Sequence, residues 1–113
     1  MIKRYKFQYD YWWNISFEID DEIYTDSEAQ LTLDFFCWTY NDKKSPIEEV
    51  LKKICIECVG LSIQGWNKHG VISEFDNLEG FPKLDGSLGI TLLEIDEFRF
   101  DSDDFHLLSV KNK

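Results

Sequence analysis

The sequence predicts one α+β domain in which two helices cover one face of an antiparallel sheet of about five strands, in the order β-β-α-α-β-β-β. Three observations predict it: a long apolar and polar alternation near the N-terminus, two helix-start signals, and three later strand-like runs. The 113 residues are 43% hydrophobic and 16% aromatic, enough to bury one core without a metal or disulfide. No stretch has the composition of a linker, so we expect residues 1–113 to form a single domain.

The N-terminal alternation predicts two strands that bury one face. From Tyr5 to Ile19 every odd position is apolar or aromatic, and the even positions are polar except for Trp12. The run is longer than an ordinary strand, so we expect two strands that meet near residues 10–12. A two-residue hairpin would reverse the alternation, so the connection needs an odd number of residues or a bulge.

Two capping signals predict the helices. Thr25 and Glu28 have the Thr-x-x-Glu spacing of a capping box, and Leu31, Phe35 and Trp38 follow at helical steps, which predicts a helix over residues 26–40. A second helix begins with Ser45 as N-cap and Pro46 at the first helical position. Its apolar stripe is Ile47, Leu51, Ile54, Cys58 and Leu61. We expect this helix to lie between the sheet and the first helix, and to end at Gly65 or Gly70.

The last third of the chain predicts three strands. Residues 71–76, 90–100 and 105–110 are rich in β-branched, aromatic and other apolar side chains. The alternation changes parity between Leu92 and Leu93, which indicates a bulge in the middle strand.

The net charge limits the kinds of partner that we expect, and the cysteine content favours one cellular compartment. A formal net charge of −10 repels nucleic acid phosphates and anionic lipid, so we expect no nucleic acid partner and no membrane partner. No apolar run has the length of a membrane span, and no h-region follows the basic N-terminus. Three cysteines, an odd number, favour free thiols in the cytoplasm.

Twelve of the 22 acidic residues fall in two short windows. The first holds Glu18, Asp20, Asp21, Glu22, Asp26 and Glu28, and the second holds Glu94, Asp96, Glu97, Asp101, Asp103 and Asp104. Such clusters serve solubility or attract a basic partner, and the sequence does not show whether the two windows share a face.

Three features are candidate binding elements, each with a structural alternative. Residues 80–89 hold three glycines, Pro82, Asp85 and Ser87, which is typical of an Ω-type loop or of a binding surface. Trp12 is an interface anchor or the cover of a turn. Asp101, Asp103 and Asp104 lack the glycine and distal Glu of a calcium loop, and form a solvated turn or part of an acidic surface.

Neither a metal nor a catalytic site follows from the remaining motifs. Cys55 and Cys58 form a C-x-x-C within a predicted amphipathic helix, where burial makes cysteines small hydrophobic residues. His69 and His106 have no evident nucleophile and orienting carboxylate beside them. We therefore expect no cofactor and no metal, and the sequence leaves enzymatic activity unsupported.

Four blocks resemble a family of small bacterial proteins of unknown function. They are Tyr11-Trp12-Trp13-Asn14 with Phe17-Glu18-Ile19-Asp20, then Glu74-Phe75-Asp76, the glycine-rich block from Gly80 to Ile90 with Asp85-Gly86-Ser87, and Asp101-Ser102-Asp103-Asp104. The resemblance covers nearly the whole chain. It implies a bacterial cytosolic origin and carries over no catalytic or ligand residue.

The leading functional hypothesis is a non-enzymatic protein-interaction domain of unknown biological role that binds a basic partner through its acidic clusters. Its candidate binding residues are Trp12, Asp85, Ser87, Asp101, Asp103 and Asp104. The alternative is a small-molecule-binding protein or enzyme that uses the loop from Gly80 to Gly89. A homodimer is a third hypothesis.

Overall fold

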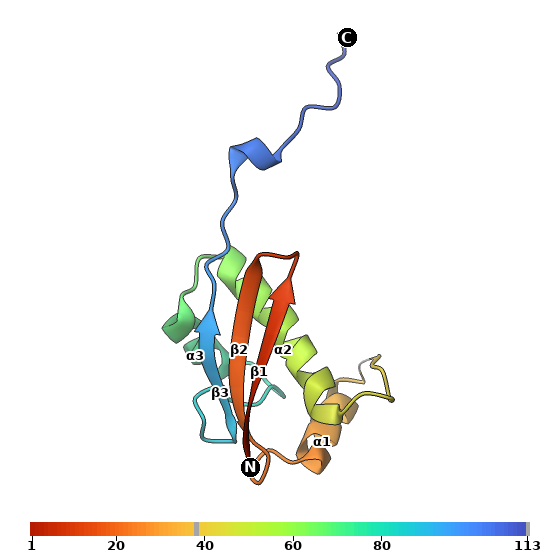
Figure 1. The fold of residues 1–113 in the computed structure, drawn as a ribbon, viewed down its shortest axis with the longest axis vertical. Coiled ribbons are helices and arrows are strands. Elements are labelled where there is room, and N and C mark those ends of the chain that lie inside the picture. The colour runs from red at the N-terminus through yellow and green to blue at the C-terminus, as the bar shows by residue number, and fades with distance from the viewer. Residues whose placement is uncertain (38, 113) are drawn as a thin grey trace.

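In residues 1–37 and 39–112, which the computed structural model describes, the chain forms a three-stranded antiparallel sheet and three helices (Figure 1). The elements, in chain order, are β1 (Ile2–Tyr9), β2 (Trp13–Asp20), α1 (Asp26–Phe36), α2 (Pro46–Ile63), α3 (Lys68–Phe75), β3 (Ile90–Ile95) and the short 3-10 turn η1 (Ser102–Asp104). The strand order is β1-β2-β3, so β2 is central, and α2 crosses behind the sheet.

The N-terminal alternation forms a hairpin, as predicted. Tyr9 pairs with Trp13, which leaves a three-residue connection, and its first two residues, Asp10 and Tyr11, have φ of 52° and 64°. An odd connection preserves the alternation, so every odd residue of β2 is buried. These side chains, Trp13, Ile15, Phe17 and Ile19, form the floor of the core.

The predicted bulge is confirmed and lies in β3. Ser16 pairs with Glu94, whereas Phe17 pairs with Leu92, so Leu93 is the extra residue. The bulge keeps Ile95 packed against the core on the same side as the buried Ile90 and Leu92.

Both predicted helix starts are confirmed. The Thr25 and Ser45 hydroxyl groups accept the amide protons of Glu28 and Glu48, at 3.2 and 3.1 Å. All five residues of the α2 stripe are buried, and Gly65, with φ of 95°, follows the helix end.

The first helix is shorter than predicted and buries a different face. It ends at Phe36, because Cys37 takes the left-handed conformation with φ of 54°. Ala29 and Leu33 are its buried residues, whereas Leu31 and Phe35 are exposed. Trp38 lies outside the described residues.

The prediction of five strands and two helices is wrong, because two of the three late runs are not strands. Residues 71–76 lie mainly in α3, whose N-cap Asn67 accepts the Gly70 amide proton at 2.9 Å. Val71 and Phe75, four residues apart, are the buried residues of this helix. Residues 105–110 belong to no strand, and the strand predicted over 90–100 ends at Ile95.

The glycine-rich loop covers the outer edge of β3. The Gly86 amide donates to the Ile90 carbonyl at 2.8 Å, and the Leu92 amide donates to the Leu84 carbonyl at 3.0 Å. Gly89 has φ of 91° and accepts the Asp20 amide proton at 2.9 Å, which ties the loop to the end of β2. The loop therefore satisfies backbone groups that an edge strand would otherwise leave open.

The chain leaves the domain after β3. We call residues 97–112 the C-terminal arm. Figure 1 shows the arm extending away from the end of the sheet, and the molecule measures 61 Å along its longest axis against 29 and 25 Å along the others.

Candidate functional site

Trp12 lies at the tip of the β1-β2 hairpin, where the C-terminal arm begins. Its ring packs edge-on against Phe98, with ring centroids 5.1 Å apart, and the residue is still 42% exposed. Phe98 also contacts Tyr9, Trp13 and Phe100. Trp12 therefore covers the base of the arm and stays partly exposed, and its role as an interface anchor stays a prediction.

Asp96 fixes the point at which the arm departs. Its carboxylate accepts the Asn14 backbone amide at 2.8 Å and the Asn14 side-chain amide at 3.2 Å. The Trp13 indole N–H donates to the Asp96 carbonyl at 2.9 Å. The arm is thus anchored at one end of the sheet.

Asp85 and Ser87 lie at the other end of the sheet and bond to each other. The Asp85 carboxylate accepts the Ser87 amide at 2.9 Å and the Ser87 hydroxyl at 2.6 Å, and these bonds lower the pKa of Asp85. The backbone of Asp85 bridges to Thr91 in β3. Both residues thus stabilise the loop that covers the edge.

The arm acids form a short turn of their own. The Asp101 carboxylate accepts the Asp103 amide at 2.9 Å and caps η1, while Asp103 and Asp104 are exposed. Since β2 and β3 run antiparallel, Asp20 lies beside the start of β3, and Glu94 and Asp96 lie at the opposite end. The two acidic windows are therefore centred on opposite ends of the sheet.

The structure brings Trp12 and the arm to one end of the molecule and keeps Asp85 and Ser87 at the other. No single site unites the predicted binding residues.

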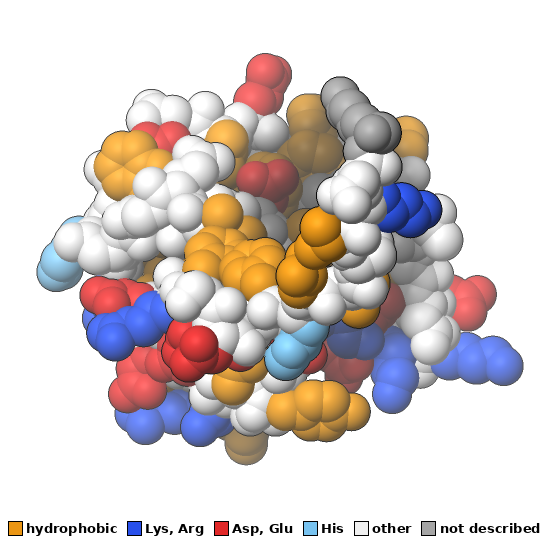
Figure 2. All heavy atoms as spheres, turned by 90° about the horizontal axis from the view of Figure 1, so that it is seen from above, with side chains coloured by type: hydrophobic (Ala, Val, Ile, Leu, Met, Phe, Trp, Pro, Cys, Tyr) orange, Lys and Arg blue, Asp and Glu red, His pale blue; other side chains and the backbone are white. Residues whose placement is uncertain are grey.

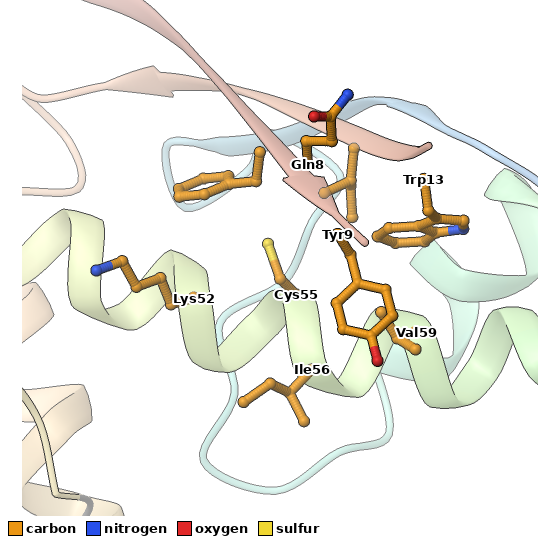
Figure 3. Close-up of a pocket in the computed structure, with 9 residues that line it drawn as sticks. Gln8, Tyr9, Trp13, Lys52, Cys55, Ile56 and Val59 are labelled. Carbon is orange, nitrogen blue, oxygen red and sulfur yellow. The ribbon is translucent and has the colours of Figure 1, made fainter. Parts of the chain in front are cut away.

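An apolar groove that the sequence did not reveal lies between β1 and α2. It encloses about 510 Å³ and is lined by Phe7, Gln8, Tyr9, Trp13, Ile15, Lys52, Cys55, Ile56 and Val59. We call it the edge groove. Figure 3 shows the Tyr9 ring reaching from the end of β1 to α2 near Val59, with the Cys55 sulfur pointing toward the strands. The sequence signal for it is the pair Cys55 and Val59, apolar residues of α2 that lie beside the predicted stripe.

The groove offers apolar contact rather than thiol chemistry. Burial raises the pKa of Cys55 to about 12, and burial also raises the pKa of Cys58. The thiolate is the reactive form, so both cysteines are unreactive near neutral pH.

The arm carries apolar side chains that contact little. The exposed fractions are 66% for Phe100, 74% for Phe105, 81% for Leu107, 94% for Leu108 and 77% for Val110. Seen from the arm's end of the molecule, hydrophobic side chains gather on the surface in the middle of the view (Figure 2). Within the described residues, no hydrogen bond is recorded for 106–112.

Comparison with known proteins places the chain in a family. The model of a family described as "Protein of unknown function (DUF2528)" matches residues 14–107. The chain belongs to the DUF2528 family. This confirms the resemblance to a family of small proteins of unknown function.

Two curated relatives of this DUF2528 domain are similar along nearly their full lengths. They are "Lambda prophage-derived protein ea10" of Escherichia coli O6:H1 and "Protein ea10" of Escherichia phage lambda. Each is 33% identical over 113 residues, with 91% of this chain and 93% of the relative covered. No solved structure matches the chain.

The matched range of the DUF2528 family continues beyond β3 to residue 107, so it includes the arm acids and Phe105. Across the described ranges, no helix has the length and hydropathy to cross a membrane. In that same part of the chain, no group of three or more His, Cys, Asp or Glu side chains is arranged to hold a metal ion.

Proposed function

We propose that this DUF2528 domain is a non-enzymatic protein-interaction domain whose C-terminal arm is the binding element. The observation that carries the proposal is the exposure of five large apolar side chains on the part of the arm that follows Phe98, which itself packs against the core. Apolar surface gathered in this way is stabilised when a partner buries it, at roughly 25 cal/mol per Å² removed from water.

The charge of the arm supports a basic partner. Asp101, Asp103 and Asp104 precede the apolar run, and the whole chain has a formal net charge of −10. An acidic segment next to apolar anchors speeds encounter with a basic surface and excludes acidic ones. The extent of the family match, which includes these acids, favours a role for the arm.

Three further expectations belong to this proposal. Trp12 extends the binding surface at the base of the arm, because its ring is partly exposed beside Phe98. The protein acts in the cytoplasm, since Cys37, Cys55 and Cys58 are free thiols. The relatives from a phage and a prophage support action inside a bacterium.

Affinity capture from a bacterial lysate tests the proposal with three full-length variants. One changes Asp101, Asp103 and Asp104 to Asn, and a second changes Leu107, Leu108 and Val110 to Ser. The control removes three exposed acids of the domain instead, through Asp42→Asn, Asp76→Asn and Glu79→Gln. We expect both arm variants to lose partners that wild type and the control retain, as identified by mass spectrometry. The same partner set for all four proteins would contradict the proposal.

A second candidate function is small-molecule binding at the glycine-rich loop. A depression of about 430 Å³ lies beside it, lined by Ile23, Tyr24, Glu28, Thr32, Gly80, Phe81, Pro82 and Leu88. The Tyr24 and Thr32 hydroxyl groups hydrogen-bond to each other at 2.9 Å and give this apolar depression a polar point. A thermal-shift screen of nucleotides, sugars and metals tests it, because a ligand at 100 times its Kd stabilises by about 2.7 kcal/mol. Unchanged melting temperatures throughout would rule against this candidate.

A further inference from the structure

We infer that the arm binds the free edge of β1 and the edge groove of a second copy of the chain, so that two copies exchange arms. This inference rests on the proposed function, since it names the partner that the arm meets. Four observations support it: the open edge of β1 beside the edge groove, the extended apolar arm, the charges of these two surfaces, and the direction of the arm.

The outer edge of β1 presents unpaired backbone groups. Met1 accepts the Asp21 amide proton at 3.2 Å, and the register then alternates along Ile2–Tyr9. In an antiparallel pair the residues bond to the partner strand at every second position, so the odd residues of β1 face β2. Arg4, Lys6 and Gln8 therefore direct their N–H and C=O groups outward.

The edge of β1 differs from that of β3, which Leu84 and Gly86 cover. Within the described residues, no backbone hydrogen bond to the outward groups of β1 is recorded. This open edge can accept one additional strand.

The edge groove lies directly below this open edge. Tyr9 on β1 and Cys55, Ile56 and Val59 on α2 line it, and Ile56 is 67% exposed. Gln8 also lines the groove, but Figure 3 shows its side chain on the side of the strand away from α2, whereas the Tyr9 ring reaches the helix. A strand added to the edge of β1 would place every second side chain over the groove.

The arm has the pattern of such a strand. Phe105 has extended backbone, with φ of −97° and ψ of 123°. In an extended segment, Phe105 and Leu107 lie on one side, and Leu108 and Val110 lie on the other. Either row can fill an apolar groove, while the backbone pairs with β1.

The charges of the two surfaces are complementary. Lys3, Arg4 and Lys6 lie on β1, and Lys52 lines the groove. Lys3 pairs with Asp21, Arg4 with Glu18, and Lys52 with Glu48 and Glu49, so among the described residues Lys6 is the cation of this set without an ion pair of its own. Asp103 and Asp104 directly precede the apolar run of the arm. Because each copy carries a formal charge of −10, association needs a local attraction, and Lys6 on the open edge supplies it.

The direction of the arm favours a second copy over its own domain. Phe98 packs on Trp12 at the hairpin tip, and beyond this contact the arm extends away from the sheet (Figure 1). The arm would have to reverse to reach its own edge groove, whereas a second copy meets it in the extended form. Reciprocal exchange places each arm on the β1 edge of the other copy. Both arms and both edges are then occupied, so assembly stops at a dimer.

Light scattering after size-exclusion chromatography provides the first test. We expect wild type to have twice the 13.4 kDa mass of one chain at high concentration. Lys6→Pro removes an outward amide without breaking a bond to β2, and Leu107→Asp with Leu108→Asp alters only the arm. Both variants should be monomers with wild-type circular dichroism.

Charge reversal supplies a matched rescue. Asp103→Lys with Asp104→Lys should weaken the dimer at least tenfold, and addition of Lys6→Glu, which leaves the Arg4–Glu18 ion pair intact, should restore part of it. Failure of the combined variant to dimerise better than the arm variant would overturn the pairing.

Cysteine cross-linking identifies the occupant. In a Cys37→Ser background, Leu107→Cys or Leu108→Cys combined with Ile56→Cys, an exposed position that lines the groove, should form a disulfide between chains under mild oxidation, and the linked species should run as a dimer on a denaturing gel. Omitting Ile56→Cys should abolish the linked species.

The outcomes separate this inference from the proposed function. A disulfide within one chain, or wild type that is monomeric at every concentration, would overturn arm exchange. If arm-dependent capture of another protein persisted alongside, the proposed function would stand without the exchange. If every arm and edge variant dimerised like wild type and the arm variants captured the same partners as wild type, both the exchange and the proposed function would be overturned.

Discussion

The domain, residues 1–96, and the C-terminal arm, residues 97–112, have similar kinds of residues and opposite environments. Phe17 in β2 is fully buried between neighbouring strands and the helices, whereas Phe105 in the arm is 74% exposed. A compact chain of this length has a radius of gyration of about 13 Å, and this one reaches 16.7 Å because of the arm.

This comparison shows that an apolar, extended segment forms a β-strand only when it can pair with the edge of another strand. β2 has β1 on one side and β3 on the other. Residues 105–110 have comparable apolar content and no neighbouring strand. Stability therefore belongs to the domain, and the arm holds surface that a partner can bury.

Truncating the matched phenylalanines gives the largest expected difference. Phe17→Ala should lower the free energy of unfolding by about 3 to 5 kcal/mol, because it leaves a cavity in the core. Phe105→Ala should change it by less than about 0.5 kcal/mol at concentrations where the chain is monomeric. Urea denaturation followed by circular dichroism measures both. Equal losses would show that the arm is part of the folded core.

The glycine-rich loop tests whether an irregular segment belongs to the domain. Gly89→Ala should cost about 2 kcal/mol or more, because φ is 91° and the added Cβ would lie 2.8 Å from the Tyr24 nitrogen. Gly60→Ala in α2 meets no atom within 4 Å and should stabilise by about 0.5 to 1 kcal/mol. Thermal melts of the two variants should move in opposite directions. A Gly89→Ala variant as stable as wild type would place the loop outside the cooperative unit.

The smallest expected difference in stability is between an acid of the domain, Glu49, and the acids of the arm. The Glu49 carboxylate, in a buried residue, pairs with Lys52 at 2.9 Å and accepts the Asn41 amide at 2.7 Å, and both contacts lower the pKa of Glu49. Glu49→Gln should cost about 1 to 2 kcal/mol at pH 7, after a discount for the exposure of Lys52. Changing Asp101, Asp103 and Asp104 to Asn should alter stability by less than about 0.5 kcal/mol.

The pH dependence of the Glu49 effect follows from the sign of its shift. The folded-state pKa lies below the unfolded one, so the stabilisation is complete above the unfolded value, about 4.3, and disappears as pH falls through the folded value. Urea titrations of wild type and Glu49→Gln should therefore converge in acid. A difference that stays constant from pH 7 to pH 2 would exclude this origin.

Local signals in the sequence predicted most of the first half of the fold. The caps at Thr25 and Ser45, the odd hairpin connection and the bulge at Leu93 depend on a few neighbouring residues, and all are present. The α3 segment was misread because its short apolar run suits either a strand or a helix. The Asn67 cap and the four-residue spacing of Val71 and Phe75 would have decided for a helix.

The number of strands and the candidate surfaces could not be predicted in the same way. Whether residues 105–110 pair depends on the position of another edge, which no local pattern encodes. The edge groove arises because residues from β1 and α2, far apart in the sequence, leave a space between them. The sequence did predict an exposed acidic segment at Asp101, Asp103 and Asp104, since consecutive charges stay in solvent.

The cover that Leu84 and Gly86 place on β3 also limits how the protein can aggregate. Growth of a fibril by edge pairing requires two receptive edges on each copy, one to join the growing end and one to extend it. Here the loop occupies one edge along residues 90–92, and among the strands in the described part of the chain only β1 offers a long open edge. Edge pairing between domains therefore ends once two copies have paired through their β1 edges. The loop on β3 prevents further copies from extending the sheet.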